Sequence, residues 1–332
     1  MKILLTGSSG RVGRAVAFEL VSNGHFVTGF DFVPPVKPIE GVDYIQSSLS
    51  NFPAVLAACM HGGFDAVAHL GAFMSWDEAD IQKMYDSNVT GTFNLLESCK
   101  LSGIKNFIFI SSGETYPEGN AVYLPVDEEH PQKPMSFYGE TKLIGENLLK
   151  FYGRKYGLSW KILRISHTQD AEELLDQDSF FSGARFFLKA KIARGKLLGK
   201  NAEVSLLEKF DDGKDKLIIS RGEDGTPYMM HITETRDTAH GIVLALLSDA
   251  GANEAFNIGN DDPFEFDKAI PLMAEMTGLQ VVDVRLPGKA VHYCTSNQKA
   301  KKFFDFKPQW DLKRMLDEAL KAFAKKHAGS IR

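Results

Sequence analysis

The sequence predicts an α/β protein with a doubly wound parallel sheet and a second, smaller domain. Short apolar runs alternate with segments of helical periodicity through the first half of the chain, which is the pattern of repeated β-α-β units. A glycine-rich turn follows the first apolar run, as expected where a strand leads into a helix. The 332 residues also exceed the usual roughly 100 to 200 residues of one domain, so an additional domain is expected.

Six strands, four connecting helices and one loop crossover are predicted before residue 168. The strands are short apolar runs bounded by Gly, Asn, Ser or Asp, at residues 2–6, 25–31, 44–46, 66–70, 106–111 and 160–165. The helices have apolar residues at helical spacing, at residues 12–22, 53–60, 84–101 and 138–156.

The regular alternation breaks down after residue 167. A mixed region follows, with a charged stretch at residues 211–216, and the alternation resumes with a helix at about 235–247 and a strand at 255–258. We therefore expect a first domain of residues 1–167 plus about 234–260, and a second domain of about 168–233 plus 261–332.

Composition excludes several classes of protein. The net charge of −5 offers no basic patch for nucleic acid. Three cysteines without close pairing predict neither a disulfide framework nor a metal site, and they fit a reducing cytoplasm. The first apolar stretch is too short for a signal peptide or a membrane span, so neither export nor membrane attachment is expected.

The glycine-rich turn at residues 6–13 predicts a dinucleotide site. Gly7 permits the tight turn, Gly10 lets backbone N–H groups approach a pyrophosphate, and Gly13 allows close packing of helix on strand. These roles predict a Rossmann-type sheet. A purely structural turn is the alternative interpretation.

Asp31 ends the second predicted strand, 18 residues after Gly13. A carboxylate at this position accepts hydrogen bonds from the adenosine ribose hydroxyls and repels a ribose phosphate, which favours NAD over NADP. Two alternatives stay open: Asp31 as a solvated turn residue, and Arg11 as an attractor of the additional phosphate of NADP.

Three further residues predict carbonyl–hydroxyl redox chemistry. Tyr138 and Lys142 are four residues apart and so lie on one face of a predicted helix. We expect the ammonium to lower the phenol pKa by roughly 1 to 3 units. Ser112, at the end of the fifth predicted strand, is placed to hydrogen-bond the reacting hydroxyl. Taken singly, each motif is also common by chance.

Together these motifs resemble the extended short-chain dehydrogenase/reductase family, in particular its NAD-dependent epimerase/dehydratase branch. Further matches follow in the expected order at residues 69–72, 88–96, 163–164, 236–239 and 256–259. The resemblance implies that Tyr138 is the acid/base, that Ser112 orients the substrate oxygen, and that Lys142 binds the nicotinamide ribose and tunes Tyr138. The cofactor residues that it implies are Gly7, Gly10, Arg11, Val12, Gly13, Asp31, Leu70, Gly71, Ala72, Asn88, Tyr138 and Lys142.

The expected substrate residues are Glu114, His167 and Arg285, and two departures from the family pattern concern this side of the site. His167 stands where members that act on nucleotide sugars usually have an asparagine, and residues 227–229 lack the usual diphosphate-binding arginine. Arg285 matches another family arginine that could supply part of the clamp; the alternative is a simple surface residue. Glu114 lacks the preceding aspartate of the family's dehydratases, which places dehydration behind the other activities.

The leading hypothesis is a nucleotide-sugar epimerase that uses NAD for hydride abstraction and return. The alternative is an NAD-dependent dehydrogenase of a free sugar, sugar acid or polyol. A third hypothesis, a cofactor-binding protein without chemistry, conflicts with the intact Ser112, Tyr138 and Lys142. The helices at 84–101 and 138–156 carry apolar residues in positions where related enzymes form dimers, so a homodimer is expected.

Overall fold

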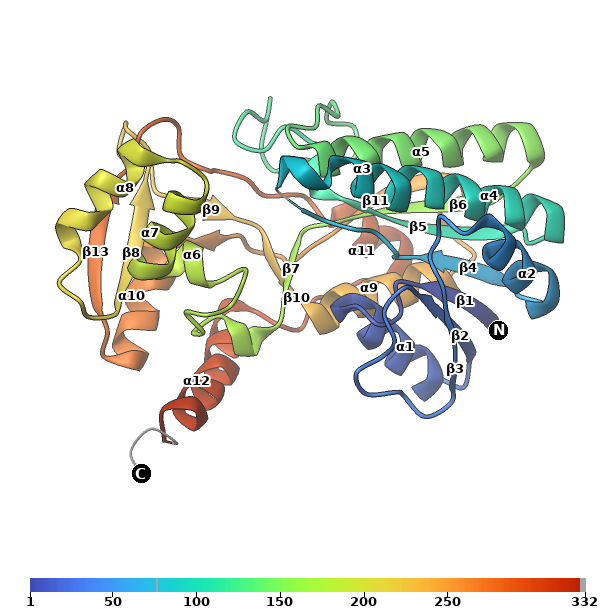
Figure 1. The fold of residues 1–332 in the computed structure, drawn as a ribbon, viewed down its shortest axis with the longest axis horizontal. Coiled ribbons are helices and arrows are strands. Elements are labelled where there is room, and N and C mark those ends of the chain that lie inside the picture. Colours follow the sequence, from blue (N-terminus) through green and yellow to red (C-terminus); the bar gives the residue numbers. More distant parts are fainter. Residues whose placement is uncertain (76, 329–332) are drawn as a thin grey trace.

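The computed structural model describes residues 1–75 and 77–328. Within these residues, seven strands form one parallel sheet, which confirms the predicted fold class (Figure 1). The strand order across the sheet is β11 (Glu254–Ile258), β6 (Ser159–Ile165), β5 (Asn106–Ser112), β4 (Ala66–His69), β1 (Lys2–Thr6), β2 (Phe26–Asp31) and β3 (Val42–Gln46). The order reverses at β1 and β4, and ligands bind beside such a reversal in open parallel sheets.

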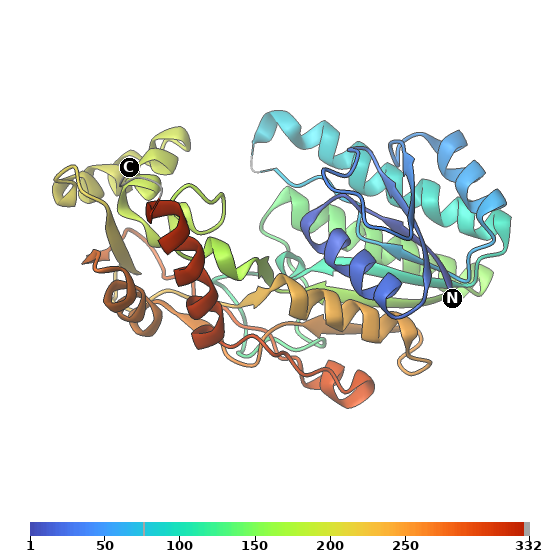
Figure 2. The same ribbon diagram turned by 90° about the horizontal axis from the view of Figure 1, so that it is seen from below.

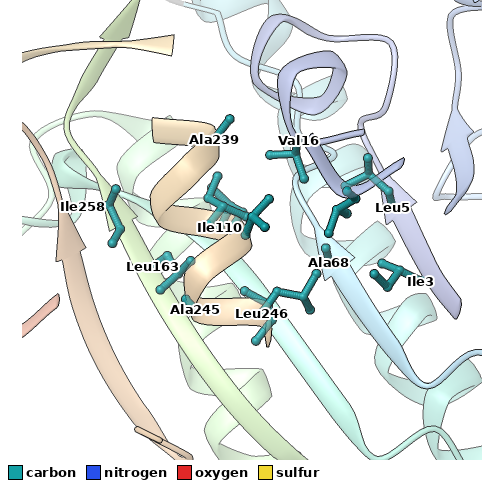
Figure 3. Close-up of a cluster of buried hydrophobic side chains, with 14 of the residues drawn as sticks. Ile3, Leu5, Val16, Ala68, Ile110, Leu163, Ala239, Ala245, Leu246 and Ile258 are labelled. Carbon is teal, nitrogen blue, oxygen red and sulfur yellow. The ribbon is translucent and has the colours of Figure 1, made fainter. Parts of the chain in front are cut away.

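Helices cover both faces of this sheet (Figures 1 and 2). One face carries α1 (Arg11–Ser22) and α9 (Thr235–Leu247), and the other carries α2 (Phe52–Gly62), α4 (Gly91–Ser102) and α5 (Phe137–Tyr156). Successive strand residues face opposite cores. Ile3 and Leu5 pack towards α1 (Figure 3), whereas Leu4 packs towards α2 and α4. Because both faces are buried, the strands are continuous apolar runs, and this made them recognisable in the sequence.

The predicted elements of the first half are present, with ends shifted by a few residues. The largest difference concerns the helix predicted at 84–101. It begins at Ile81 as α3 (Ile81–Met84), widens into a π-helical turn at Tyr85–Thr90, and continues as α4. The loop crossover between β2 and β3 is as predicted.

The remaining elements form a second lobe, seen on the left of Figure 1. Its core lies around a parallel strand pair that the sequence did not predict, β8 (Lys216–Arg221) with β13 (Gln280–Arg285). The strands are β7 (His167–Gln169), β8 (Lys216–Arg221), β9 (Met229–Met230), β10 (Ile232–Glu234), β12 (Phe264–Glu265) and β13 (Gln280–Arg285). The helices are α6 (Gly183–Phe186), α7 (Leu188–Leu197), α8 (Asn201–Leu207), α10 (Phe266–Thr277) and α12 (Leu312–Ala328).

One late segment packs on the first lobe. Ala300 and Phe304 of α11 (Gln298–Phe304), followed by Phe306, join the core formed by α1 and α9. We propose that the first domain includes residues 298–306 in addition to 1–167 and about 234–260.

The structure also bears on the expectations for cysteines, metals and membranes. Cys59 and Cys99 are free thiols that lie side by side between α2 and α4, a proximity that their sequence spacing did not reveal. In the described residues, no group of three or more His, Cys, Asp and Glu side chains is arranged to hold a metal ion. No helix among them is long and apolar enough to cross a membrane.

Candidate active site

A cavity of about 970 Å³ opens at the carboxyl ends of the central strands. It extends from the glycine-rich turn, past the ends of β4 and β5, to the start of β7 in the second lobe. All but two of the predicted site residues line it. Those lining it are Gly7, Gly10, Arg11, Val12, Gly13, Asp31, Leu70, Gly71, Ala72, Ser112, Glu114, Tyr138, Lys142 and His167.

The glycine-rich turn has the geometry that the sequence predicted. Gly7 has a φ of +71°, which favours glycine, and a side chain there would meet the backbone of Gly71 at 2.7 Å. A Cβ at Gly13 would lie 2.0 Å from the carbonyl oxygen of Gly7, so this position needs glycine for helix–strand packing. A Cβ at Gly10 has only one neighbour, at 3.4 Å. The turn therefore leaves the start of α1 open to a phosphate group, as a dinucleotide requires.

Asp31 connects the turn to the loop after β2. Its two carboxylate oxygens accept hydrogen bonds from the backbone N–H groups of Ser9, at 2.8 Å, and Val33, at 3.0 Å. These bonds fix the carboxylate at the cavity wall and leave lone pairs for further donors. This arrangement suits the ribose hydroxyls of NAD.

Arg11 is held by the second lobe. One of its nitrogens, Nη2, lies 2.7 Å from Glu173 Oε1, and Nε lies 3.7 Å from Asp170 Oδ2. The guanidinium also lies 5.1 Å from the centre of the Phe181 ring. Because its charge is engaged by these two carboxylates, Arg11 is poorly placed to attract the additional phosphate of NADP.

Asn88 was expected to line the cofactor groove, but it is not part of the cavity wall and supports that wall from behind. It is 3% exposed in the π-helical turn, and its side-chain amide is paired with Phe73: Oδ1 accepts from Phe73 N at 2.7 Å, and Nδ2 donates to Phe73 O at 2.9 Å. Nδ2 also donates to Thr141 Oγ1 at 3.0 Å. Asn88 thus joins the segment after β4 to α5, which carries Tyr138.

The turn at Ser112 packs tightly against the start of α5. The Ser112 hydroxyl accepts a hydrogen bond from Glu114 N at 3.1 Å, so its own proton is available to a ligand in the cavity. Ser136 caps α5 by accepting from Gly139 N at 3.0 Å, and it donates to Glu114 Oε2 at 2.5 Å. A Cβ at Gly139 would lie 2.3 Å from the Glu114 carbonyl oxygen, so glycine is required for this contact.

The electrostatics around Tyr138 differ from the expectation. Burial raises the pKa of the phenol and the negative charge of Glu114 raises it further. Lys142 lies with Nζ 5.7 Å from the ring centre, but Nζ donates to Ile110 O at 2.9 Å, and burial lowers the pKa of Lys142 to about 8. The prediction that Lys142 lowers the Tyr138 pKa is therefore wrong for the protein alone, because desolvation dominates both groups.

A buried ion pair fixes the back of α5 to the sheet. Arg164 on β6 binds both carboxylate oxygens of Glu146, at 2.8 and 3.0 Å, and Ser111 Oγ donates to the same carboxylate at 2.7 Å. Arg164 also donates to the Tyr116 hydroxyl at 2.7 Å. Since Glu146 is one turn beyond Lys142 on the helix, this network sets the position of α5 against β5 and β6.

On the substrate side, His167 lines the cavity but Arg285 does not. The His167 ring lies against Phe181, with ring centres 5.4 Å apart, and its Nε2 is hydrogen-bonded to Arg185. Glu118 adds a second carboxylate near Glu114. Arg285 is exposed on β13 beside Gly225, so the structure does not bring it to the site.

Sequence reasoning missed Glu118, Phe181 and Arg185. Glu118 is four residues after Glu114, in an irregular segment that gave no periodic signal. Arg185 lies on a helix of four residues, too short for a hydrophobic pattern to reveal. Only the position of these residues near recognised motifs could have suggested them.

Most of the chain matches a known protein family. Residues 3–259 match the model of the NAD dependent epimerase/dehydratase family. A UDP-glucose 4-epimerase of Corynebacterium glutamicum is 28% identical, over 96% of this chain and 94% of that protein.

Solved structures resemble the whole chain. A short-chain dehydrogenase/reductase superfamily protein of Agrobacterium tumefaciens, crystallised with bound NAD, is 45% identical with a TM-score of 0.95, over 100% of both chains. A UDP-glucose 4-epimerase of Thermotoga maritima in complex with UDP-glucose shares the fold at 24% identity, with a TM-score of 0.77 over 98% of this chain and 100% of that one.

Proposed function

The chain belongs to the NAD-dependent epimerase/dehydratase family, and we propose that it is a nucleotide-sugar epimerase with NAD as its cofactor. The observation that carries the proposal is the single cavity that joins the glycine-rich turn to Ser112, Tyr138 and Lys142. The likeness to UDP-glucose 4-epimerases over almost the whole chain supports the reaction class.

The proposed roles follow from the positions of the side chains. Backbone N–H groups at the start of α1 bind the pyrophosphate, and Asp31 accepts hydrogen bonds from the hydroxyls of the adenosine ribose. Lys142 donates a hydrogen bond to the nicotinamide ribose. When bound, NAD supplies the acceptor and donor of the hydride. The Ser112 hydroxyl, oriented by Glu114 N, donates to the substrate oxygen and holds it beside Tyr138.

Tyr138 moves the proton of the substrate hydroxyl. Its raised pKa keeps the phenol protonated in the protein alone, which suits the step in which a proton is returned. As a base, Tyr138 requires positive charge nearby, and Lys142 contributes one at 5.7 Å from the ring centre. Since burial lowers the Lys142 pKa to about 8, this charge is present at neutral pH and is lost as the pH rises above that value.

An alternative function, net dehydrogenation of a free sugar, sugar acid or polyol, is favoured by one observation. Residues 227–229 lack the diphosphate-binding arginine that is usual in this stretch, and Arg285 lies outside the cavity. A substrate without a diphosphate needs neither arginine.

The test that separates the two functions measures the reduced cofactor and the product stereochemistry together. Purified protein is incubated with nucleotide sugars and, separately, with free sugars and sugar acids. An epimerase converts a nucleotide sugar to its epimer with no net accumulation of NADH. Steady NADH production from an unlinked sugar, with no epimer from any nucleotide sugar, would overturn the proposal in favour of the alternative.

We also propose a homodimer formed through α4 and α5. Phe93 and Phe151 are 45% and 46% exposed on these neighbouring helices, which supports an apolar interface. Leu96 and Tyr152, two further apolar residues of the helices on which the expected dimer rested, are buried in the core of their own chain. Sedimentation at micromolar concentration should give the mass of two chains, and a monomeric mass would contradict the proposal. The three free cysteines support a cytoplasmic location.

A further inference from the structure

We infer that His167 binds an anionic oxygen of the substrate through one fixed Nδ1–H donor, and that Arg185 is the positioning residue that fixes it. This inference rests on the proposed function for the identity of the ligand. The state of the histidine ring is a property of the protein itself and is testable without any substrate.

The first step is the hydrogen bond between the two side chains. Arg185 Nη2 is bonded to His167 Nε2, and a guanidinium has only donors. Nε2 must therefore be the acceptor, so the ring is neutral and carries its hydrogen on Nδ1. A protonated ring would place an N–H group against the N–H of a cation.

The second step concerns the charges that face the ring from each neighbouring element. Arg185 approaches from α6 and Arg11 from the glycine-rich turn, and both oppose protonation of His167. Burial, followed by these two cations, holds the pKa of His167 well below its ordinary value. The nearby carboxylates act on the arginines: Glu114 and Glu118 on Arg185, and Glu173 and Asp170 on Arg11.

The third step is the direction of the free donor. Nδ1 of His167 has no hydrogen-bond partner among the described residues, and the atom is accessible to solvent. Since His167 lines the cavity and its ring is braced by Phe181, Nδ1–H is available to a molecule in the cavity. A donor flanked by two guanidinium groups favours a negatively charged acceptor.

Two ligands supply such an oxygen: the phosphate of a nucleotide sugar, and the carboxylate of a sugar acid. Both would use the same N–H group. KM values measured separately for a nucleotide sugar and for a free sugar acid distinguish the two sources.

The direct test is nitrogen-15 NMR of histidine-labelled protein, with the His167 signal assigned from its loss in His167→Gln. We expect the Nδ1–H tautomer at every pH from about 5 to 8, because the neutral ring has no accessible protonation step there. In Arg185→Met the pKa of the His167 ring should rise, but it should stay below its ordinary value because burial and Arg11 still lower it. Arg185→Lys, which keeps a cationic donor, should restore much of the wild-type behaviour.

The kinetic test measures KM against pH with whichever substrate class turns over. His167→Phe, which removes the donor, should raise KM roughly 10- to 100-fold, with a smaller effect on kcat. The KM of Arg185→Met should depend on pH more than that of the wild type and fall as the pH drops towards the raised pKa of His167, because a protonated ring attracts an anion. Arg285→Met removes an arginine outside the cavity, and its KM profile should follow that of the wild type.

Several outcomes would overturn the inference. An Nε2–H tautomer, or titration near 6.5 in the wild type, would remove the role of Arg185. An unchanged KM in His167→Phe would remove the role of His167. If instead no nucleotide sugar is epimerised but the Nδ1–H tautomer is present and His167→Phe raises the KM of a sugar acid, the proposed function fails while the inference stands.

Discussion

Two glycines of the same turn should respond differently to alanine, because they are needed for different reasons. At Gly13 the added Cβ would lie 2.0 Å from Gly7 O and 2.8 Å from Gly7 C, both backbone atoms. Relief of this clash requires α1 and the turn to separate by at least about 1 Å, and overpacking of this kind costs roughly 1–3 kcal/mol. Gly13→Ala should lower the free energy of unfolding by that amount and also weaken NAD binding.

Gly10→Ala is the matched control for stability. The backbone at Gly10 is extended, with φ −72° and ψ 167°, and the nearest neighbour of the added Cβ is Gly7 O at 3.4 Å. The free energy of unfolding should therefore stay within about 0.5 kcal/mol of the wild type, or rise slightly. The methyl group, however, projects where the pyrophosphate is proposed to approach, so the Kd for NAD should rise at least about 10-fold, which corresponds to about 1.4 kcal/mol.

The assays are urea unfolding followed by tryptophan fluorescence, and calorimetric titration with NAD. The reasoning predicts that Gly13→Ala loses both stability and affinity, whereas Gly10→Ala loses affinity alone. Wild-type NAD affinity in Gly10→Ala would show that the cofactor does not approach this turn. Wild-type stability in Gly13→Ala would contradict the packing argument.

Three further predictions concern the cofactor, the chemistry and the support of α5. NAD should bind more tightly than NADP, and Asp31→Ser should reduce the difference between the two affinities, measured by titration with each cofactor. Equal affinities in the wild type would contradict the role of Asp31. Tyr138→Phe should reduce turnover by roughly two to four orders of magnitude while NAD still binds. Lys142→Met should weaken both turnover and NAD binding. Near-normal turnover of Tyr138→Phe would exclude Tyr138 as the proton carrier. Glu146→Gln should lower the free energy of unfolding near neutral pH by roughly 3–5 kcal/mol, because it leaves the buried Arg164 without its counter-charge. The control Glu223→Gln, at an exposed carboxylate, should have little effect on the free energy of unfolding. Burial alone would raise the Glu146 pKa, but the hydrogen bond and charge of Arg164 hold it below its ordinary 4.5. The stabilisation by this ion pair is therefore fully present above pH 4.5. The difference in unfolding free energy between wild type and variant should shrink as the pH falls through the lowered pKa.

The sequence predicted the features that depend on neighbouring residues. The glycine-rich turn, Asp31 and the Tyr138–Lys142 spacing each lie within one β-α-β unit, where strand ends and helix starts are marked by local residue choice. The three glycines of the turn, Asp31, Tyr138 and Lys142 all line the cavity in the structure.

Features that depend on distant contacts were not predicted. The high pKa of Tyr138 results from burial and from Glu114, which is brought close by the contact between Gly139 and the turn after β5. The supporting role of Asn88 depends on the π-helical turn, which a regular helical pattern does not indicate. Arg185 lies in the region where alternation of strands and helices had ceased, so the pattern gave it no place near His167.

Arg11 provides the last prediction, since it was the residue that left the choice of NAD over NADP open. In the structure its guanidinium is engaged by Glu173 at 2.7 Å and by Asp170 at 3.7 Å, so its charge is largely compensated before any cofactor binds. Glu173→Gln combined with Asp170→Asn keeps the side-chain sizes and removes both counter-charges. Arg11 should then attract the ribose phosphate, and the ratio of NADP to NAD affinity should rise, more so when Asp31→Ser is added. The control is the same set with Arg11→Met, in which the increase should vanish. If the ratio stays constant with Arg11 freed, Arg11 does not reach the ribose phosphate, and the preference for NAD depends on Asp31 alone.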